Sequence, residues 1–182
     1  MTANALIVID VQQGFDHEGY WGPRNNPACE DNIRALLAHW RAQGFPIVLV
    51  QHDSMGAKSP LRPGQSGHDF KPGIAGPHDL LVNKTVNSAF YGEPDLDAWL
   101  KASGIYAVTI CGITTNHCCD TTARMAWNLG YDVTFVLDAT HTFDRNDVEG
   151  QVISAEQIAR TTGANLHGEF ATVRSTAEVL SA

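Results

Sequence analysis

Residues 106–119, YAVTICGITTNHCC, decide the fold class of this chain. The stretch begins with a continuous apolar run, Tyr106–Cys111, and passes through a polar turn into the helical spacing of Asn116–Leu129, which stops at Gly130. Strands buried on both faces are continuously apolar, because helices cover both sides of a parallel sheet. This part of the sequence therefore predicts a strand–turn–helix unit of an α/β fold.

Similar apolar runs recur on both sides of this unit. Three of them predict clear strands, at Ala5–Ile9, Pro46–Val50 and Val133–Leu137. Two weaker strands are predicted at Leu80–Lys84 and Ala164–Leu166. Helical spacing occurs between and after them, at Asn32–Gln43, Pro94–Ser103, Val148–Thr161 and Thr172–Leu180. The alternation predicts one domain over residues 1–182 with a doubly wound α/β fold, in which helices cover both faces of a mostly parallel, six-stranded sheet.

The composition excludes several classes of protein. Of 182 residues, 43% are hydrophobic and 18% are charged, which is typical of a globular chain. The formal net charge of −8 argues against nucleic acid as a partner, and no apolar run is long enough to span a membrane. The first residues lack the basic region of a secretory signal. We therefore expect a cytoplasmic protein with four reduced cysteines, Cys29, Cys111, Cys118 and Cys119.

Ligands of open α/β sheets bind outside the carboxyl ends of the strands, where three reactive side chains are expected to meet. Asp10 follows the first strand, Lys84 ends the third, and Cys118 lies in the first turn of the helix after the fourth. A helix N-terminus favours a thiolate, and Lys84 would lower the thiol pKa further. With Asp10 as proton acceptor, the pattern indicates a nucleophile and its base.

The neighbouring Cys119 is the alternative nucleophile. It shares a face of small residues with Ala123 and Ala126 that can pack on the sheet, and Cys118 lies about 100° away around the helix. The phase favours Cys118 as the nucleophile, but a shift of one residue in the helix start would reverse the two roles.

Three motifs around these residues carry a family resemblance. They are VIDVQ at residues 8–12, KTxxSAF from Lys84, and GxxTxxCxxTTA at residues 112–123. In this order they resemble the isochorismatase-like cysteine hydrolase superfamily, which includes nicotinamidases and N-carbamoylsarcosine amidases. The resemblance implies an Asp10–Lys84–Cys118 catalytic triad.

The resemblance also implies features of the turn before the nucleophile. It implies a cis peptide bond between Ile113 and Thr114, and an oxyanion hole formed by the backbone N–H groups of Thr114 and Cys118. The family members that cleave the vinyl ether of isochorismate replace the cysteine, which this chain keeps. The retained cysteine favours attack on an amide-like carbon.

Six further residues near the triad are candidates for the substrate pocket: Phe15, Trp21, His52, Phe90, Tyr91 and His117. For the aromatic residues among them, a place in the core is the alternative. The long irregular segment from His52 to Pro77 is rich in Gly and Pro, and we expect it either to cover the substrate or to form a packed connection.

Neither a metal nor another cofactor is expected. Nicotinamidase-type relatives hold a metal with an Asp-x-His pattern after the second strand, whereas here His52 and Asp53 are adjacent and reversed. Neighbours in an extended segment point to opposite faces and chelate poorly.

The sequence thus predicts a hydrolase that cleaves a C–N bond of a small amide, carbamoyl or lactam compound through a thioester. One alternative is a redox-responsive protein that uses Cys118 and Cys119, although adjacent cysteines form strained disulfides. A non-catalytic, ligand-binding oligomer of the same fold is the other. The expected partners are a small-molecule substrate and further copies of the chain.

Overall fold

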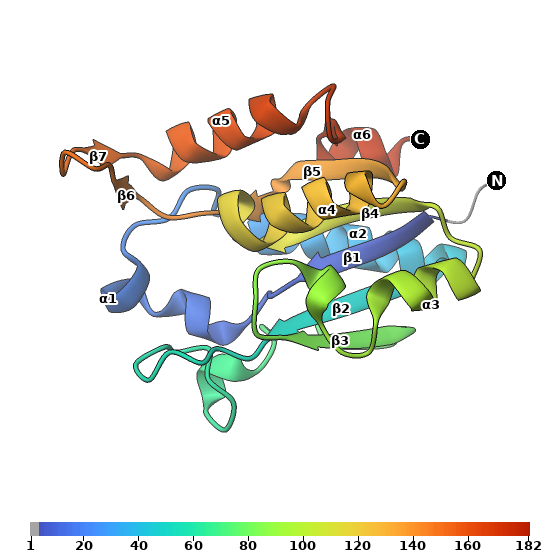
Figure 1. The fold of residues 1–182 in the computed structure, drawn as a ribbon, viewed down its shortest axis with the longest axis horizontal. Coiled ribbons are helices and arrows are strands. Elements are labelled where there is room, and N and C mark those ends of the chain that lie inside the picture. Colours follow the sequence, from blue (N-terminus) through green and yellow to red (C-terminus); the bar gives the residue numbers. More distant parts are fainter. Residues whose placement is uncertain (1–3) are drawn as a thin grey trace.

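A six-stranded sheet in the order β3–β2–β1–β4–β5–β8 forms the centre of the computed structural model, which describes residues 4–182 (Figure 1). All of its pairings are parallel. The strands are β1 Asn4–Ile9, β2 Ile47–His52, β3 Leu80–Lys84, β4 Ala107–Ile113, β5 Asp132–His141 and β8 Thr172–Arg174. The predicted fold class is confirmed. Because β1 and β4 are adjacent and central, the segments that follow them meet at the middle of the carboxyl edge.

Helices cover both faces of the sheet, as Figure 1 shows. One face carries α2 Cys29–Gln43 and α6 Thr176–Leu180. The other carries α3 Leu96–Ala102, α4 Asp120–Asn128 and α5 Ala155–Leu166. The remaining elements are the short helix α1 Glu18–Trp21, the single turns η1 Gln13–Asp16, η2 Ser66–His68, η3 Ala89–Tyr91 and η4 Thr115–Cys119, and a hairpin of β6 Arg145–Asn146 and β7 Val152–Ile153.

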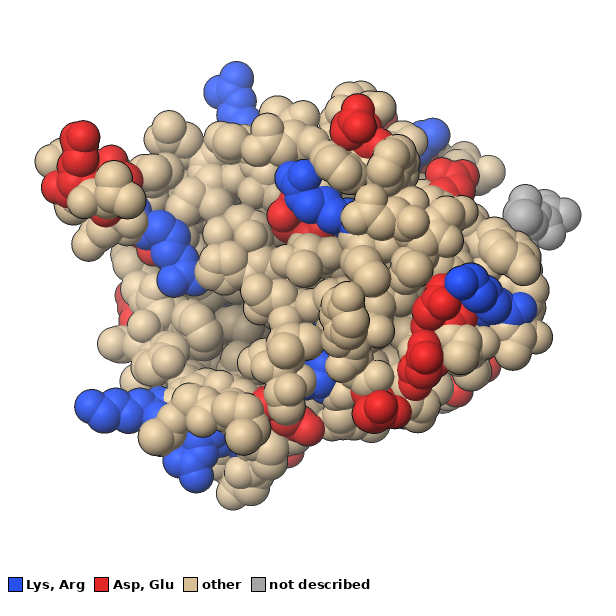
Figure 2. Space-filling model, viewed as in Figure 1, with Lys and Arg blue, Asp and Glu red and all other residues tan. Residues whose placement is uncertain are grey.

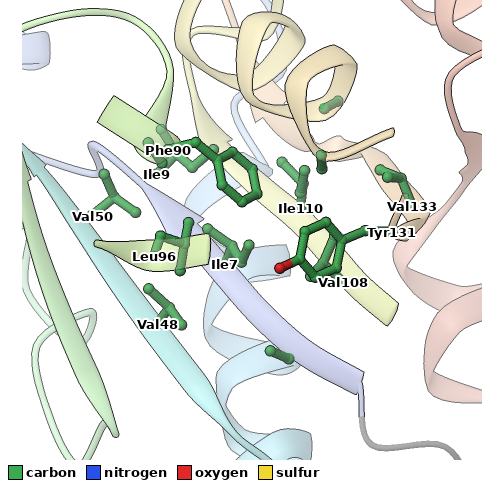
Figure 3. Packing of buried hydrophobic residues seen from close by; sticks show 14 of the residues in the cluster. Ile7, Ile9, Val48, Val50, Phe90, Leu96, Val108, Ile110, Tyr131 and Val133 are labelled. Atoms are coloured by element: carbon green, nitrogen blue, oxygen red, sulfur yellow. The ribbon is translucent and has the colours of Figure 1, made fainter. Parts of the chain in front are cut away.

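Strand β1 shows why the central strands are apolar throughout. Leu6 and Val8 are buried in the cluster under α2, whereas Ile7 and Ile9 are buried in the cluster on the opposite face. Figure 3 shows Ile7 and Ile9 packed beside residues of β2 and β4 in this second cluster. Neighbouring side chains of a strand point to opposite faces, so a strand between two helical layers needs apolar residues at every position.

Helix α2 follows from its sequence by the same logic. Ile33, Leu36 and Trp40 recur at helical spacing and are all buried against the sheet. Gly44 ends the helix in the left-handed conformation, with φ of 66°, which glycine adopts without steric cost.

The C-terminal third differs from the sequence prediction. The predicted strand Ala164–Leu166 is the last turn of α5, and the sixth strand is β8, which had been predicted as the start of the final helix. That helix, α6, begins after Ser175, whose side chain and Glu178 form a capping box. Strand β8 has three residues and pairs only with β5, so its sequence carries too short a pattern to separate strand from helix.

The predicted helix Val148–Thr161 also begins later than expected, since residues 148–153 belong to the β6–β7 hairpin and its turn. Helix α5 begins after Ser154, whose side chain accepts a hydrogen bond from the backbone N–H of Gln157. A serine in this position satisfies an otherwise unpaired N–H group and starts the helix there.

The long segment after β2 is packed on the body of the protein. Leu61 and Ile74 are buried in it, and the buried Lys71 side chain ties it to the segment after β1 through Asp16. The segment is thus packed on the protein, and it also contributes Leu61 to the wall of the site described below.

The surface in Figure 2 carries Lys and Arg side chains as separate spots among Asp and Glu, without one continuous basic area on this face. None of the helices within residues 4–182 combines the length and the apolar character needed to cross a bilayer.

Candidate active site

Asp10, Lys84 and Cys118 meet at the centre of the carboxyl edge, as the sequence predicts. Lys84 Nζ donates a hydrogen bond to Asp10 Oδ2 at 2.6 Å and lies 3.4 Å from Cys118 Sγ. The exposed fractions are 0% for Asp10, 2% for Lys84 and 8% for Cys118. We call these residues the Asp–Lys–Cys cluster.

The backbone after β4 brings Cys118 to this position. Gly112 pairs with Ile9 at φ of 131°, and a Cβ atom here would overlap the backbone of Ile9, so only glycine allows the two central strands this approach. The peptide bond between Ile113 and Thr114 is cis. The chain then forms the π-helical turn η4, which ends at Cys119 immediately before α4.

The two adjacent cysteines have different surroundings. Cys118 lines a cavity, whereas Cys119 is fully buried in the core cluster together with Ala123 and Ala126. The prediction from helix phase is therefore confirmed for the packing of both residues. All four cysteines are free thiols, and no observation favours a redox pair at Cys118 and Cys119.

The electrostatics of the cysteine differ from the sequence prediction. Burial raises the pKa of the Cys118 thiol well above its usual value, the Asp10 carboxylate raises it further, and Lys84 opposes both only in part. Burial lowers the pKa of Lys84, but Asp10 and Cys118 outweigh this effect and raise it overall. This direction is opposite to the lowered thiol pKa expected from the sequence, because Lys84 offsets only part of the effect of lost water around the sulfur. Lys84 and Asp10 form a buried ion pair beside the sulfur.

The cavity over the Asp–Lys–Cys cluster has a volume of about 110 Å³. Its lining residues are Asp10, Phe15, Trp21, His52, Leu61, Asn87, Thr114, His117 and Cys118. Four of the six predicted pocket residues are among them, namely Phe15, Trp21, His52 and His117.

The other two predicted pocket residues do not line the cavity. Phe90 packs in the core against Tyr131, with 5.8 Å between the ring centroids, and Tyr91 is 70% exposed. The turn η3 directs the two adjacent side chains in opposite directions. Their closeness to Lys84 in the sequence does not indicate this. Leu61 and Asn87 are lining residues that the sequence analysis missed. Leu61 lies in a segment without periodic pattern, and Asn87 occupies a variable position of the KTxxSAF motif.

Gln12 from the first motif connects the segments that border the cavity. Its Oε1 accepts a hydrogen bond from the backbone N–H of His52 at 2.9 Å, and its Nε2 donates to the backbone oxygen of His68 at 2.9 Å. The side chain is fully buried. Gln12 therefore fixes the end of β2, and with it His52, relative to β1.

Two buried polar atoms of cavity-lining residues have no hydrogen-bond partner within residues 4–182. They are Asp10 Oδ1 and Thr114 Oγ1. Buried polar atoms are nearly always paired in folded proteins, so their clustering at one cavity indicates a site for a polar molecule.

The same residues do not fit a metal ion. Asp10, His52 and Cys118 offer ligand atoms within 4.8 Å of one another. However, Lys84 Nζ lies 3.3 Å from His52 Nδ1, in addition to its contacts with the other two, so a fixed positive charge already occupies the space between them. Asp53 turns away and contacts His68 Nε2 at 2.6 Å.

The protein therefore has a Rossmann-like α/β fold. A buried carboxylate, ammonium and thiol lie together at the carboxyl edge of its parallel sheet. The Isochorismatase domain family matches residues 4–178, and the chain belongs to this family. The family protein YrdC of Bacillus subtilis is 40% identical over 179 residues, which cover 97% of this chain and 94% of YrdC. An isochorismatase-family structure from Chromobacterium violaceum is 39% identical with a TM-score of 0.92, over 99% of this chain and 92% of that one.

Two further matches bear names that describe an activity. A cysteine hydrolase structure from Pseudomonas syringae has a TM-score of 0.86 at 27% identity, over 98% of this chain and 91% of that one. Nicotinamidase 3 of Arabidopsis thaliana is 30% identical over 158 residues, which cover 77% of this chain and 74% of that protein. The chain is an isochorismatase-family hydrolase.

Proposed function

We propose that the protein is a cysteine hydrolase that cleaves a C–N bond in a small amide, carbamoyl or lactam compound through a thioester intermediate. The observation that carries the proposal is the contact of Lys84 Nζ with both Asp10 Oδ2 and Cys118 Sγ beneath a cavity of about 110 Å³. The similarity to a nicotinamidase supports an amide substrate, and the cavity volume supports a small one.

In the first step the Cys118 thiol gives its proton to Asp10 while the sulfur attacks the carbonyl carbon. Asp10 Oδ1 has no other hydrogen-bond partner within residues 4–182 and is the acceptor. Burial holds the pKa of Cys118 high, so the proton leaves as the S–C bond forms and no stable thiolate precedes the attack. Lys84 stabilises the negative charge that Asp10 and the sulfur share. Such positioned proton transfer typically contributes about 10²–10⁴-fold to a rate.

The tetrahedral oxyanion accepts hydrogen bonds from the backbone N–H groups of Thr114 and Cys118. A donor of this kind is worth about 3–4 kcal/mol in the transition state. Asp10 returns the proton to the leaving nitrogen, the C–N bond breaks, and a thioester on Cys118 remains. Asp10 then takes a proton from water, the water oxygen attacks the thioester carbon, and the released sulfur recovers its proton from Asp10.

The test is to trap the intermediate. The purified protein is incubated with a mixture of small primary carboxamides, carbamoyl compounds and lactams, quenched with acid and digested. Mass spectrometry of the Cys118 peptide is expected to detect an acyl adduct, with release of the matching amine or ammonia.

Two variants serve as controls. Cys118→Ala is expected to form no adduct and to hydrolyse nothing, whereas Cys119→Ser keeps the nucleophile and is expected to form the same adduct. Turnover by folded Cys118→Ala, or an adduct carried by Cys119, would contradict the proposed function.

A further inference from the structure

Asn87 lies in the cavity wall without a role in the mechanism above. Its Oδ1 accepts a hydrogen bond from the Cys118 thiol, with 3.8 Å between Oδ1 and Sγ, and this is the only side-chain hydrogen bond of Asn87 within residues 4–182. The thiol proton leaves for Asp10 in the proposed first step, and Oδ1 is then free to accept another. A carboxamide provides one acceptor oxygen and two N–H donors. Most of this hydrogen-bonding capacity is therefore available to a molecule in the cavity.

The segment around Asn87 is held in place by its neighbours. The next residue, Ser88, is buried, and its side chain accepts a hydrogen bond from the backbone N–H of Phe90 at 3.3 Å. The backbone N–H of Ala89 donates to Thr122 Oγ1 of α4 at 3.1 Å. These bonds connect the segment to the helix that follows Cys118, so the fold holds the backbone of Asn87 beside that helix.

The position of Oδ1 relates to the bond that breaks. When Sγ attacks the carbonyl carbon, the leaving nitrogen is two bonds away from the sulfur. An acceptor 3.8 Å from the sulfur can then reach an N–H on that nitrogen when the leaving group is oriented toward Asn87. Lys84 cannot take this role, because its ammonium group only donates. Asp10 is engaged with Lys84 and with the moving proton.

We infer that Asn87 is a specificity-determining residue that selects amides over esters. This inference rests on the proposed function. Asn87 Oδ1 accepts a hydrogen bond from the N–H of the leaving group, which orients the nitrogen to receive the proton from Asp10. An ester has no hydrogen on its leaving oxygen and therefore makes no such bond.

The test compares amide and ester hydrolysis in Asn87→Ala and in the wild type. The substrates are the carboxamide that gives the acyl adduct in the trapping experiment and its methyl ester, with nicotinamide and methyl nicotinate as the first pair. The ratio of kcat/KM for amide over ester is expected to fall about tenfold, the factor that one net hydrogen bond provides. Val86→Ala, at an exposed neighbour outside the cavity, is the matched control and is expected to keep the ratio.

Asn87→Asp provides the conservative rescue. It keeps an acceptor oxygen, so the ratio is expected to return toward that of the wild type, while the added negative charge beside the sulfur lowers both rates. Equal losses of amide and ester hydrolysis in Asn87→Ala, with the Cys118 adduct still formed, would overturn the inference and leave the proposed function intact. Absence of any Cys118 adduct in the wild type would overturn both.

Discussion

Two buried lysines, Lys84 and Lys71, have nearly the same exposure and different surroundings. Lys84 is 2% exposed and Lys71 is 4% exposed, and each donates to a carboxylate oxygen at 2.6 Å. Lys84 also contacts a thiol under a cavity. Lys71 instead contacts a second carboxylate, Glu30, at 2.6 Å.

We call Lys71, Asp16, Glu30 and Arg24 the Lys71 cluster. It differs from the Asp–Lys–Cys cluster in the third group, which lies beside the lysine and its first carboxylate. Glu30 is also bonded to Arg24, and the hydrogen bonds from Arg24 and Lys71 outweigh the effect of burial and lower the pKa of Glu30. The charges around Lys71 are thus balanced and fixed. Around Lys84 the third group is Cys118, whose pKa is raised by burial and whose proton Asp10 accepts in the proposed mechanism. A buried ion pair becomes chemically useful when a group with a transferable proton lies beside it.

The largest effect is expected from Asp10→Asn, which removes the proposed proton acceptor of the Asp–Lys–Cys cluster. Asn keeps an oxygen for Lys84 and tolerates the left-handed backbone of this position, where φ is 52°. We expect kcat/KM to fall by about 10²–10⁴-fold. Circular dichroism provides the control for folding. If Asp10→Asn were as active as the wild type within experimental error, the proposal that only the cluster around Lys84 takes part in the chemistry would be wrong.

The second prediction concerns Lys71→Met. Breaking a buried ion pair typically costs 3–5 kcal/mol, and we expect about 2–3 kcal/mol here because Arg24 continues to neutralise Glu30. Urea unfolding measures this loss, and kcat/KM per folded molecule is expected to stay at the wild-type value. A specific loss of activity in fully folded Lys71→Met would assign the Lys71 cluster a part in the chemistry.

The third prediction concerns pH and uses His141, which lies 3.8 Å from Glu30 in the Lys71 cluster. Burial, followed by the charge of Arg24, lowers the pKa of His141 from 6.5 to about 3. Between these two values the unfolded chain binds a proton that the folded one does not, so stability present above about pH 6.5 is lost as the pH falls. This group alone lowers the free energy of unfolding by at most about 2 kcal/mol between pH 7 and pH 5.

The matched variant for this prediction is His141→Leu, which has no proton to bind. Its free energy of unfolding is expected to depend less on pH than that of the wild type across the same range. Parallel pH profiles for the two proteins would contradict the assignment.

The smallest effect is expected from Asp16→Ala. The Asp16 side chain is 60% exposed, although its partner Lys71 is buried. Water screens such a pair, so we expect a loss of at most about 1 kcal/mol in urea unfolding and unchanged activity. A loss as large as that of Lys71→Met would show that Asp16, and not Glu30, is the main partner of the lysine.

The sequence predicted the centre of this molecule better than its margins. Strand β3 has the predicted bounds, and Asp10, Lys84 and Cys118 meet as their motifs imply. Each of these features depends on a short stretch of chain and on the rule that strand ends gather at one edge. Strand β8 was missed because its pairing with β5, rather than its own composition, makes it a strand.

The sequence alone determined the alternation of apolar runs and amphipathic segments, and hence the parallel sheet and the three reactive side chains at its carboxyl edge. These are local properties of the chain. Only the tertiary structure decided that Leu61 and Asn87 enter the cavity wall, that Phe90 is directed into the core, and that burial raises the pKa of the Cys118 thiol. The wall of a cavity and the burial of a side chain are both formed by segments that lie far apart in the sequence. A single stretch of sequence therefore cannot reveal them.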